Sequence, residues 1–164
     1  MYAPHRFLAL TLLLCANVVS AELRYEGRVV GVADGDTITV LDDNNVQHKV
    51  RLMGIDAPEK SQDFGNVSRQ HLAARVFSKT VAVEYSKVDR YRREIGKVLF
   101  DGKDINLEQV FTGMAWHYKK YAREQPPEDQ DKYAIAENRA RVLAVGLWSL
   151  PSPVPPWDYR RSRR

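Results

Sequence analysis

Three alternating segments separated by two strong turn signals occupy residues 23–52, and they constrain the fold more than any other feature of the sequence. The first two segments are rich in valine, isoleucine and threonine and flank Asp34-Gly35, a dipeptide typical of hairpin turns. A run of aspartate and asparagine at residues 42–45 marks the second turn and leads into the third segment. We therefore expect a three-stranded antiparallel meander.

The third segment ends in a short stretch that contains a cation, two carboxylates and a forced bend. Gly54 lets the backbone turn, and Pro58 holds the residue before it extended. Asp56 and Glu59 therefore follow the end of the strand, and Arg51 directly precedes it. Loops at strand ends often carry functional side chains on a rigid scaffold. Two carboxylates beside an arginine indicate a metal bound next to an anion.

Asp36, just past the first hairpin turn, is a candidate partner for Asp56. In a meander the first and third strands flank the second, so these two positions can approach each other. Two close carboxylates repel each other unless a proton or a cation lies between them. Oxygen donors favour magnesium, manganese or calcium over zinc, and no paired histidine spacing supports zinc. The alternative stays open that Asp36 is only a turn residue and that Asp56 only caps a bend.

Arginines and aromatic residues supply further candidates. A guanidinium offers a planar fork of donors that matches phosphate oxygens, and Arg51 and Arg93 together with a metal would suit phosphoryl transfer. Glu59 near such a phosphate could orient or deprotonate an attacking water. Tyr91 and Tyr121, which are flanked by charged residues, could stack on bases. A merely solvated basic loop around Arg93 is the alternative.

The remaining pattern places two more strands and three helices after the meander. Strands are expected at residues 80–88 and 95–100. Helices are expected from Asn66 or Ser68 to about residue 79, from Asp104 or Asn106 to residue 112, and over residues 128–144. This order predicts a mainly β, α+β fold, a five-stranded OB-fold barrel with about three helices packed at its side.

Both ends of the chain differ from this domain, which we place at residues 22–149. Residues 1–21 have a weakly basic start, a short apolar run and small residues before Glu22, as in a signal peptide; an uncleaved membrane anchor is the alternative. Cleavage would remove Cys15, the only cysteine, and would lower the formal net charge of +4 by one. Residues 150–164 form a Pro-rich basic tail that we expect to be extended. We expect an exported protein without disulfides or stable membrane association, and its mildly basic charge permits nucleic acid as a partner.

The ordered set of motifs resembles the staphylococcal nuclease (thermonuclease) family over about residues 27–148. The motifs are Asp34-Gly35-Asp36-Thr37, Arg51-Leu52, Asp56-Ala57-Pro58-Glu59 and Asp89-Arg90-Tyr91-Arg92-Arg93. This resemblance implies a five-stranded barrel, a bound calcium ion (Ca2+) and hydrolysis of DNA and RNA to 3′-phosphate products. The tail resembles that of secreted Gram-negative members, which implies a secreted or periplasmic protein.

The resemblance also implies roles for single residues. By motif position, the metal would be held by Asp36, Asp56 and the backbone carbonyl of Ala57. The catalytic residues would be Arg51, Glu59 and Arg93. The substrate would be contacted by Arg90, Tyr91, Tyr118 and Tyr121, with Trp116 as another candidate for the aromatic platform.

Two departures from the family pattern affect this assignment. Ala57 stands where threonine is common, which a backbone carbonyl ligand would survive. Arg92 replaces a glycine, so this residue must accept an unusual φ or the turn must differ, and the placement of Arg93 depends on that turn.

Two functions fit these observations, a calcium-dependent sugar-nonspecific nuclease and a noncatalytic nucleic-acid-binding module on the same barrel. The first is favoured because all five polar positions of the motif set are present, and an empty acidic cluster would repel phosphate. DNA and RNA are the expected partners, no protein partner is implied, and a monomer is expected. The tail arginines Arg160 and Arg161 are expected to add only weak, salt-sensitive attraction to nucleic acid.

Overall fold

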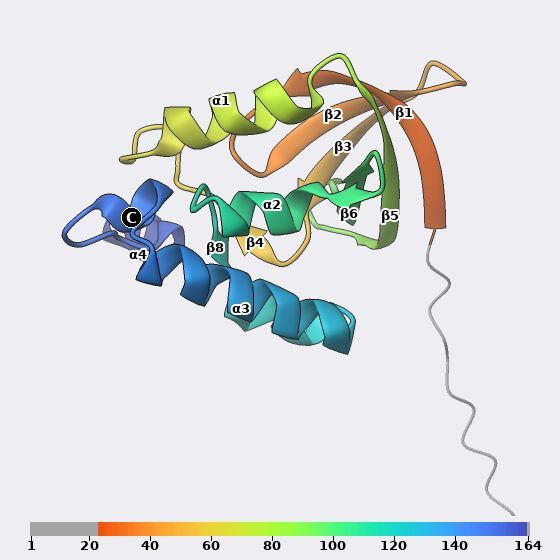
Figure 1. Cartoon of the computed structure of the whole chain (residues 1–164). Helices are drawn as coiled ribbons and strands as arrows, with labels where there is room; N and C mark the ends of the chain where they lie inside the picture. Colours follow the sequence, from red (N-terminus) through yellow and green to blue (C-terminus); the bar gives the residue numbers. More distant parts are fainter. Residues whose placement is uncertain (1–22, 164) are drawn as a thin grey trace, which may run out of the picture.

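The computed structural model describes residues 23–163, and a closed barrel of five strands forms its centre (Figure 1). The barrel strands are β1 (Leu23–Val32), β2 (Thr37–Asp42), β3 (Gln47–Leu52), β5 (Thr80–Val88) and β6 (Glu94–Phe100). They pair in the order β3-β2-β1-β5-β6, and a parallel pairing of β3 with β6 closes the barrel. A short strand, β7 (Lys103–Asp104), extends the sheet beside β6. The predicted barrel fold and its N-terminal meander are confirmed.

Strand register places the start of β2 beside the end of β3. Thr37 pairs with Arg51 across this antiparallel ladder. The backbone N–H of Leu52 also donates to the carbonyl of Asp36 at 2.8 Å. The turn after β1 and the end of β3 therefore lie next to each other at one end of the barrel, as the meander predicted.

Four helices cover one side and one end of the barrel (Figure 1). They are α1 (Gly65–Val76), α2 (Ile105–Phe111), α3 (Pro127–Val142) and α4 (Pro156–Ser162). The α2 start agrees with the sequence prediction, because the Asp104 side chain accepts from the N–H of Leu107 at 3.0 Å. The α1 start does not agree. Phe64 is its N-cap, with a positive φ of 65° and no side-chain cap, and Ser68 lies buried inside the helix.

Shorter elements lie between the barrel strands and these helices. They are β4 (Ile55–Asp56), β8 (Trp116–His117) and two 3-10 helices, Lys119–Glu124 and Gly146–Ser149. The two short strands pair antiparallel and form a separate two-stranded sheet. Asp56 therefore does not sit at the end of the third barrel strand, as expected, but in β4 after a turn at Met53 and Gly54.

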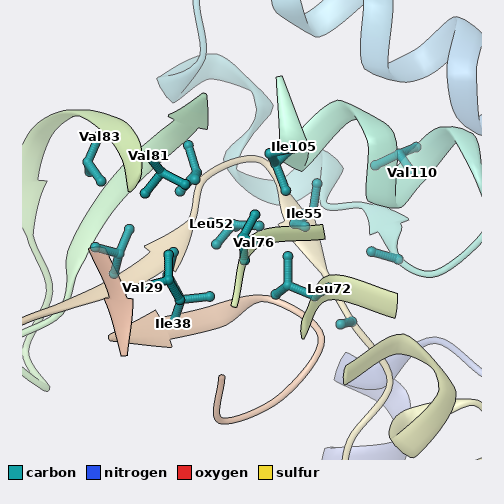
Figure 2. Close-up of a cluster of buried hydrophobic side chains, with 14 of the residues drawn as sticks. Val29, Ile38, Leu52, Ile55, Leu72, Val76, Val81, Val83, Ile105 and Val110 are labelled. Carbon is teal, nitrogen blue, oxygen red and sulfur yellow. The ribbon is translucent and has the colours of Figure 1, made fainter. Parts of the chain in front are cut away.

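Apolar side chains from the barrel and from α1, α2 and α3 form the main core, part of which Figure 2 shows. Leu72 and Val76 of α1 and Ile105 and Val110 of α2 are fully buried against the barrel interior. A second cluster holds the C-terminal part of the chain, and its buried members are Trp116, Ala140, Leu147 and Trp148. Burial of aliphatic side chains contributes about 1.5–3 kcal/mol each, so these contacts fix the helices against the barrel.

The C-terminal segment is not extended throughout, contrary to the sequence prediction. Residues 156–162 form α4, which begins at Pro156 where a missing N–H carries no penalty. In the described part of the chain no helix is long and apolar enough to cross a membrane. The predicted signal peptide, with Cys15, lies outside the described residues.

Candidate active site

Arg51 joins the two predicted metal-binding aspartates in one buried cluster. One terminal nitrogen, Nη1, lies 2.7 Å from Oδ2 of Asp36 and also donates to the carbonyl of Ile55 at 3.1 Å. The other, Nη2, donates to Oδ1 of Asp56 at 2.8 Å. Both carboxylates are buried, and the arginine side chain is 14% exposed. The structure thus brings together three residues that the sequence placed in separate motifs.

Asp36 is held by its own turn and by the residue after Asp56. The Asp36 N–H donates to the side chain of Asp34 at 3.0 Å, and the Ala57 N–H donates to Oδ2 of Asp36 at 2.6 Å. Burial raises the pKa of Asp36, whereas Arg51 and the Ala57 N–H oppose that shift. Added positive charge nearby would stabilise the ionised form of this buried carboxylate.

Gly35 is required by the packing of this turn. A Cβ at this position would lie 1.9 Å from Oγ of Ser68 and 2.7 Å from Cβ of Ala57. The turn that carries Asp36 is therefore pressed against both α1 and the loop that follows β4. This close approach fixes the separation of Asp36 from Ala57.

Glu59 lies at the edge of this cluster and contacts a residue that the sequence did not assign to the site. Its Oε1 accepts from Arg160 at 2.7 Å, and its side chain is 39% exposed. Arg160 also contacts Asp56 at 2.7 Å. The expectation that Arg160 is an exposed tail cation equivalent to Arg161 is therefore wrong. Arg161 is 79% exposed and pairs only with its neighbour Asp158 among the described residues.

Arg93 is held by the loop that precedes β6. Its guanidinium pairs with Asp89 at 2.8 Å, and the Asp89 side chain also accepts from the N–H groups of Tyr91 and Arg93. Arg92 has a positive φ of 62°, which answers the question raised by its replacement of a glycine. Strand β6 runs parallel to β3, and Ile95 pairs with Arg51. Residues two apart in extended chain share a face of the sheet, so Arg93 lies on the same face as Ile95 and Arg51. No contact joins Arg93 to the Arg51 cluster in the described residues.

The candidate substrate-binding aromatics divide into two groups. Tyr91 is 63% exposed, and the guanidinium groups of Arg90 and Arg93 lie 4.9 and 5.4 Å from its ring centre. Tyr118 and Tyr121 form a second group beside β8, with ring centres 5.0 Å apart and planes nearly perpendicular. Two lysines approach the Tyr121 ring within 6 Å, as expected for a surface that attracts phosphates.

Trp116 does not belong to an exposed platform. It is buried and packs edge-on against Trp148 at 4.2 Å, with Arg141 over its ring. Among the three aromatic candidates after β7, the structure leaves Tyr118 and Tyr121 as possible substrate contacts. Tyr118 is partly covered by Trp157 of α4, whose ring stacks on it.

Two buried amides of α2 position the loops of the cluster, and sequence reasoning missed both. The Asn106 side chain donates to the carbonyls of Met53 and Gly96 and accepts from the N–H of Val98. The Gln109 side chain donates to the carbonyl of Gly35 at 2.8 Å.

One sequence signal could have indicated them. Both amides interrupt the apolar face of a seven-residue helix, and buried amides normally have specific partners. Two of their partners, Met53 and Gly35, lie in turns 53 and 74 residues away along the chain, so only the fold identifies them.

The donor chemistry of the site fits a hard cation. Asp36 and Asp56 supply carboxylate oxygens, which suit calcium or magnesium and not zinc. Within residues 23–163 no group of three acidic, histidine or cysteine side chains is arranged around a common point. A cation here would thus need oxygen atoms from the backbone, water or substrate as well.

The match to a protein-family model identifies the chain's relatives. Residues 49–150, more than half of the chain, match the model described as staphylococcal nuclease homologue. The chain belongs to the staphylococcal nuclease family. The matched region includes Arg51, Asp56, Glu59 and the loop at Arg93, whereas Asp36 precedes it, and the family that the motifs resemble is confirmed.

Curated relatives agree over nearly their whole lengths. The chain is 40% identical to an uncharacterized endonuclease of Haemophilus influenzae over 97% of this chain and 87% of the relative. It is 41% identical to a micrococcal nuclease of Shigella flexneri over 89% of this chain and 86% of the relative. A third relative, protein ParB of Escherichia coli, is 43% identical over 93% and 88%. This family member is therefore a nuclease that hydrolyses nucleic acids, and the alternative of a noncatalytic binding module is set aside.

Proposed function

We propose that this nuclease requires calcium, cleaves both DNA and RNA, leaves 3′-phosphate ends and acts in the periplasm or outside the cell as a monomer. The single observation that carries the proposal is the buried fork of Arg51 between Asp36 and Asp56, with Glu59 at the rim of the same cluster. Calcium would be held by the two aspartates and the Ala57 carbonyl, and it would supply positive charge beside the phosphate being attacked.

The reaction follows from the groups around the cluster. Glu59 accepts a proton from a water molecule, whose oxygen attacks the phosphorus atom. The bond between phosphorus and the 5′ oxygen then breaks and that oxygen takes a proton from solvent water, so the phosphate stays on the 3′ side and the other product leaves with a 5′ hydroxyl. Arg51 and Arg93 stabilise the negative charge that builds on the phosphoryl oxygens.

Lack of sugar and base preference has a physical basis in this surface. Tyr91 and Tyr121 offer ring faces on which any base can stack, as does Tyr118 where Trp157 does not cover it, and the arginines and lysines beside these rings attract phosphates. None of these contacts distinguishes a ribose from a deoxyribose. Export is supported by the signal-like composition of residues 1–21.

One experiment tests the proposal. Purified protein starting at Glu22 is incubated with plasmid DNA and with RNA, in calcium or in excess chelator, beside the Glu59→Gln variant. We expect cleavage of both substrates only with calcium, and a loss of rate of roughly a hundred- to ten-thousand-fold in the variant. A DNA polymerase should extend the DNA products only after phosphatase treatment, because a 3′ phosphate blocks extension. Full activity in chelator, or products extended without phosphatase, would contradict the proposal.

A further inference from the structure

The C-terminal helix α4 is docked on the active-site side of β8 and on the loop after β4. The ring of Trp157 stacks on Tyr118, with centres 5.2 Å apart and planes at 7°, and meets Trp116 edge-on at 5.6 Å. The hydroxyl of Tyr159 donates to the carbonyl of Ser61 at 2.9 Å. Aromatic pairs of this kind add stabilisation beyond that of their buried area, so these contacts hold the helix in one position.

Docking of α4 places the guanidinium of Arg160 on the two carboxylates with the most direct roles in the proposed chemistry. Its Nη2 donates to Oδ2 of Asp56 at 2.7 Å, and its Nη1 donates to Oε1 of Glu59 at 2.7 Å and to Oδ1 of Asp56 at 3.2 Å. Asp56 is 1% exposed, so its bonds to the arginine are shielded from solvent. Charge-assisted, bidentate contacts of this kind are among the stronger hydrogen bonds in proteins.

These contacts use the same oxygen atoms that the reaction needs. Oδ1 of Asp56 already accepts from Arg51, and Oδ2 accepts from Arg160. A divalent cation that binds Asp56 must take one of these oxygens, and two positive groups at that spacing repel each other. Glu59 can accept a proton from water only with the oxygen that Arg160 does not hold. The docked arginine and an active, metal-bound site are therefore competing arrangements.

We propose that α4 is a built-in cap and that Arg160 occupies the acidic site in competition with the divalent cation. This inference rests on the proposed role of Asp56 as a metal ligand. Binding of calcium and release of Arg160 are coupled, so the apparent calcium affinity equals the intrinsic affinity multiplied by the fraction of molecules with the cap open. Trp157 also covers Tyr118, so the same opening uncovers a ring that can stack on a base.

The test compares calcium affinity in three full-length proteins. These are the native protein, Arg160→Gln and the matched control Arg161→Gln, which changes the neighbouring exposed arginine. The dissociation constant is obtained from melting temperatures over a series of calcium concentrations. If the cap is closed about nine-tenths of the time, Arg160→Gln should bind calcium about tenfold more tightly, or about 1.4 kcal/mol. Arg161→Gln should match the native protein.

Fluorescence gives a second measurement that does not depend on turnover. Release of the cap separates Trp157 from Tyr118, so calcium alone should change the tryptophan emission of the native protein. Trp157→Phe should weaken that change, because it removes the indole of the cap helix and leaves Trp116, which contacts that helix, as the nearest reporter of its release. Circular dichroism confirms that each variant is folded.

Three outcomes would contradict the proposal that α4 is a cap. One is equal calcium affinity in Arg160→Gln and Arg161→Gln. Another is unchanged affinity with lost turnover in Arg160→Gln, which would make Arg160 a substrate contact. In both cases the calcium-dependent nuclease would stand. A third is the absence of any calcium-induced melting shift in all three proteins, in which case the cap and the metal part of the proposed function fail together.

Discussion

Replacement of Asn106 by alanine should destabilise the protein strongly, because this buried amide ties together the turn after β3 and strand β6. Its side chain donates to the carbonyl of Met53 at 3.1 Å and accepts from the N–H of Val98 at 3.1 Å. The carbonyl of Gly96, its third partner, keeps another bond from the Met53 N–H at 2.8 Å. In Asn106→Ala, two buried groups, the Met53 carbonyl and the Val98 N–H, therefore lose this partner.

The size of the effect follows from those two groups. A buried polar group left without a partner costs about 1–3 kcal/mol, so Asn106→Ala should lower the free energy of unfolding by about 2–6 kcal/mol. That is a large part of the stability of a typical domain. The turn at Met53 also leads into Asp56, so kcat should fall at temperatures where the variant is folded.

Urea unfolding at constant pH, followed by circular dichroism, measures this change. The exposed Asn66 of α1 offers a matched control, since Asn66→Ala makes the same chemical change without a buried bond. The control should stay within about 0.5 kcal/mol of the native protein. A loss below 1 kcal/mol in Asn106→Ala would refute the argument that this amide holds the turn.

Three further predictions concern other parts of the barrel and the site. Desolvation lowers the pKa of His48, but hydrogen bonds to Glu94 and Asp42 outweigh it and raise the pKa above 6.5. The stability that His48 adds should therefore be full below pH 6.5 and should disappear as the pH rises through the raised pKa. The measurement is the difference in unfolding free energy between the native protein and His48→Gln as a function of pH. Gly35→Ala should lower the unfolding free energy by about 1–3 kcal/mol through overpacking, whereas Gly31→Ala, whose new Cβ has neighbours no closer than 3.5 Å, should change it little; equal melting temperatures would contradict this. Asp89→Ala should raise KM for single-stranded DNA several-fold by freeing the loop before β6, and an unchanged KM in steady-state assays would exclude that role.

Local signals in the sequence were sufficient for the barrel and for the central cluster. The Asp34-Gly35 turn and the alternating segments around it specify a meander, and a meander brings the residues after its first strand and at its third strand together. For this reason Asp36, Arg51 and Asp56 could be grouped before any contact was known. The prediction that Asp56 lies at the end of the third barrel strand was wrong, because a two-residue strand such as β4 leaves no periodic pattern in the sequence.

The start of α1 and the loop at Arg92 show where local reasoning stopped. A serine near an expected helix start predicts a cap, but burial of Ser68 against the Asp36 turn places it inside the helix. The sequence left two options at Arg92, a positive φ or a different turn. Hydrogen bonds from the backbone N–H groups of Tyr91 and Arg93 to the Asp89 side chain decide for the positive φ. In both cases packing or side-chain bonding outweighs a weak propensity.

The sequence by itself determined the strand order of the meander, the turn chemistry and the acidic and basic groups of the site, since each depends on residues close together in the chain. Only the tertiary structure decided that Asn106 holds the turn after β3 and that Arg160 contacts Asp56, 104 residues away along the chain. The composition of the tail indicated an exposed basic segment, and nothing local distinguishes Arg160 from Arg161. The difference arises because Trp157 and Tyr159 seat α4 in one orientation, which turns one arginine toward the buried carboxylate and the other toward solvent.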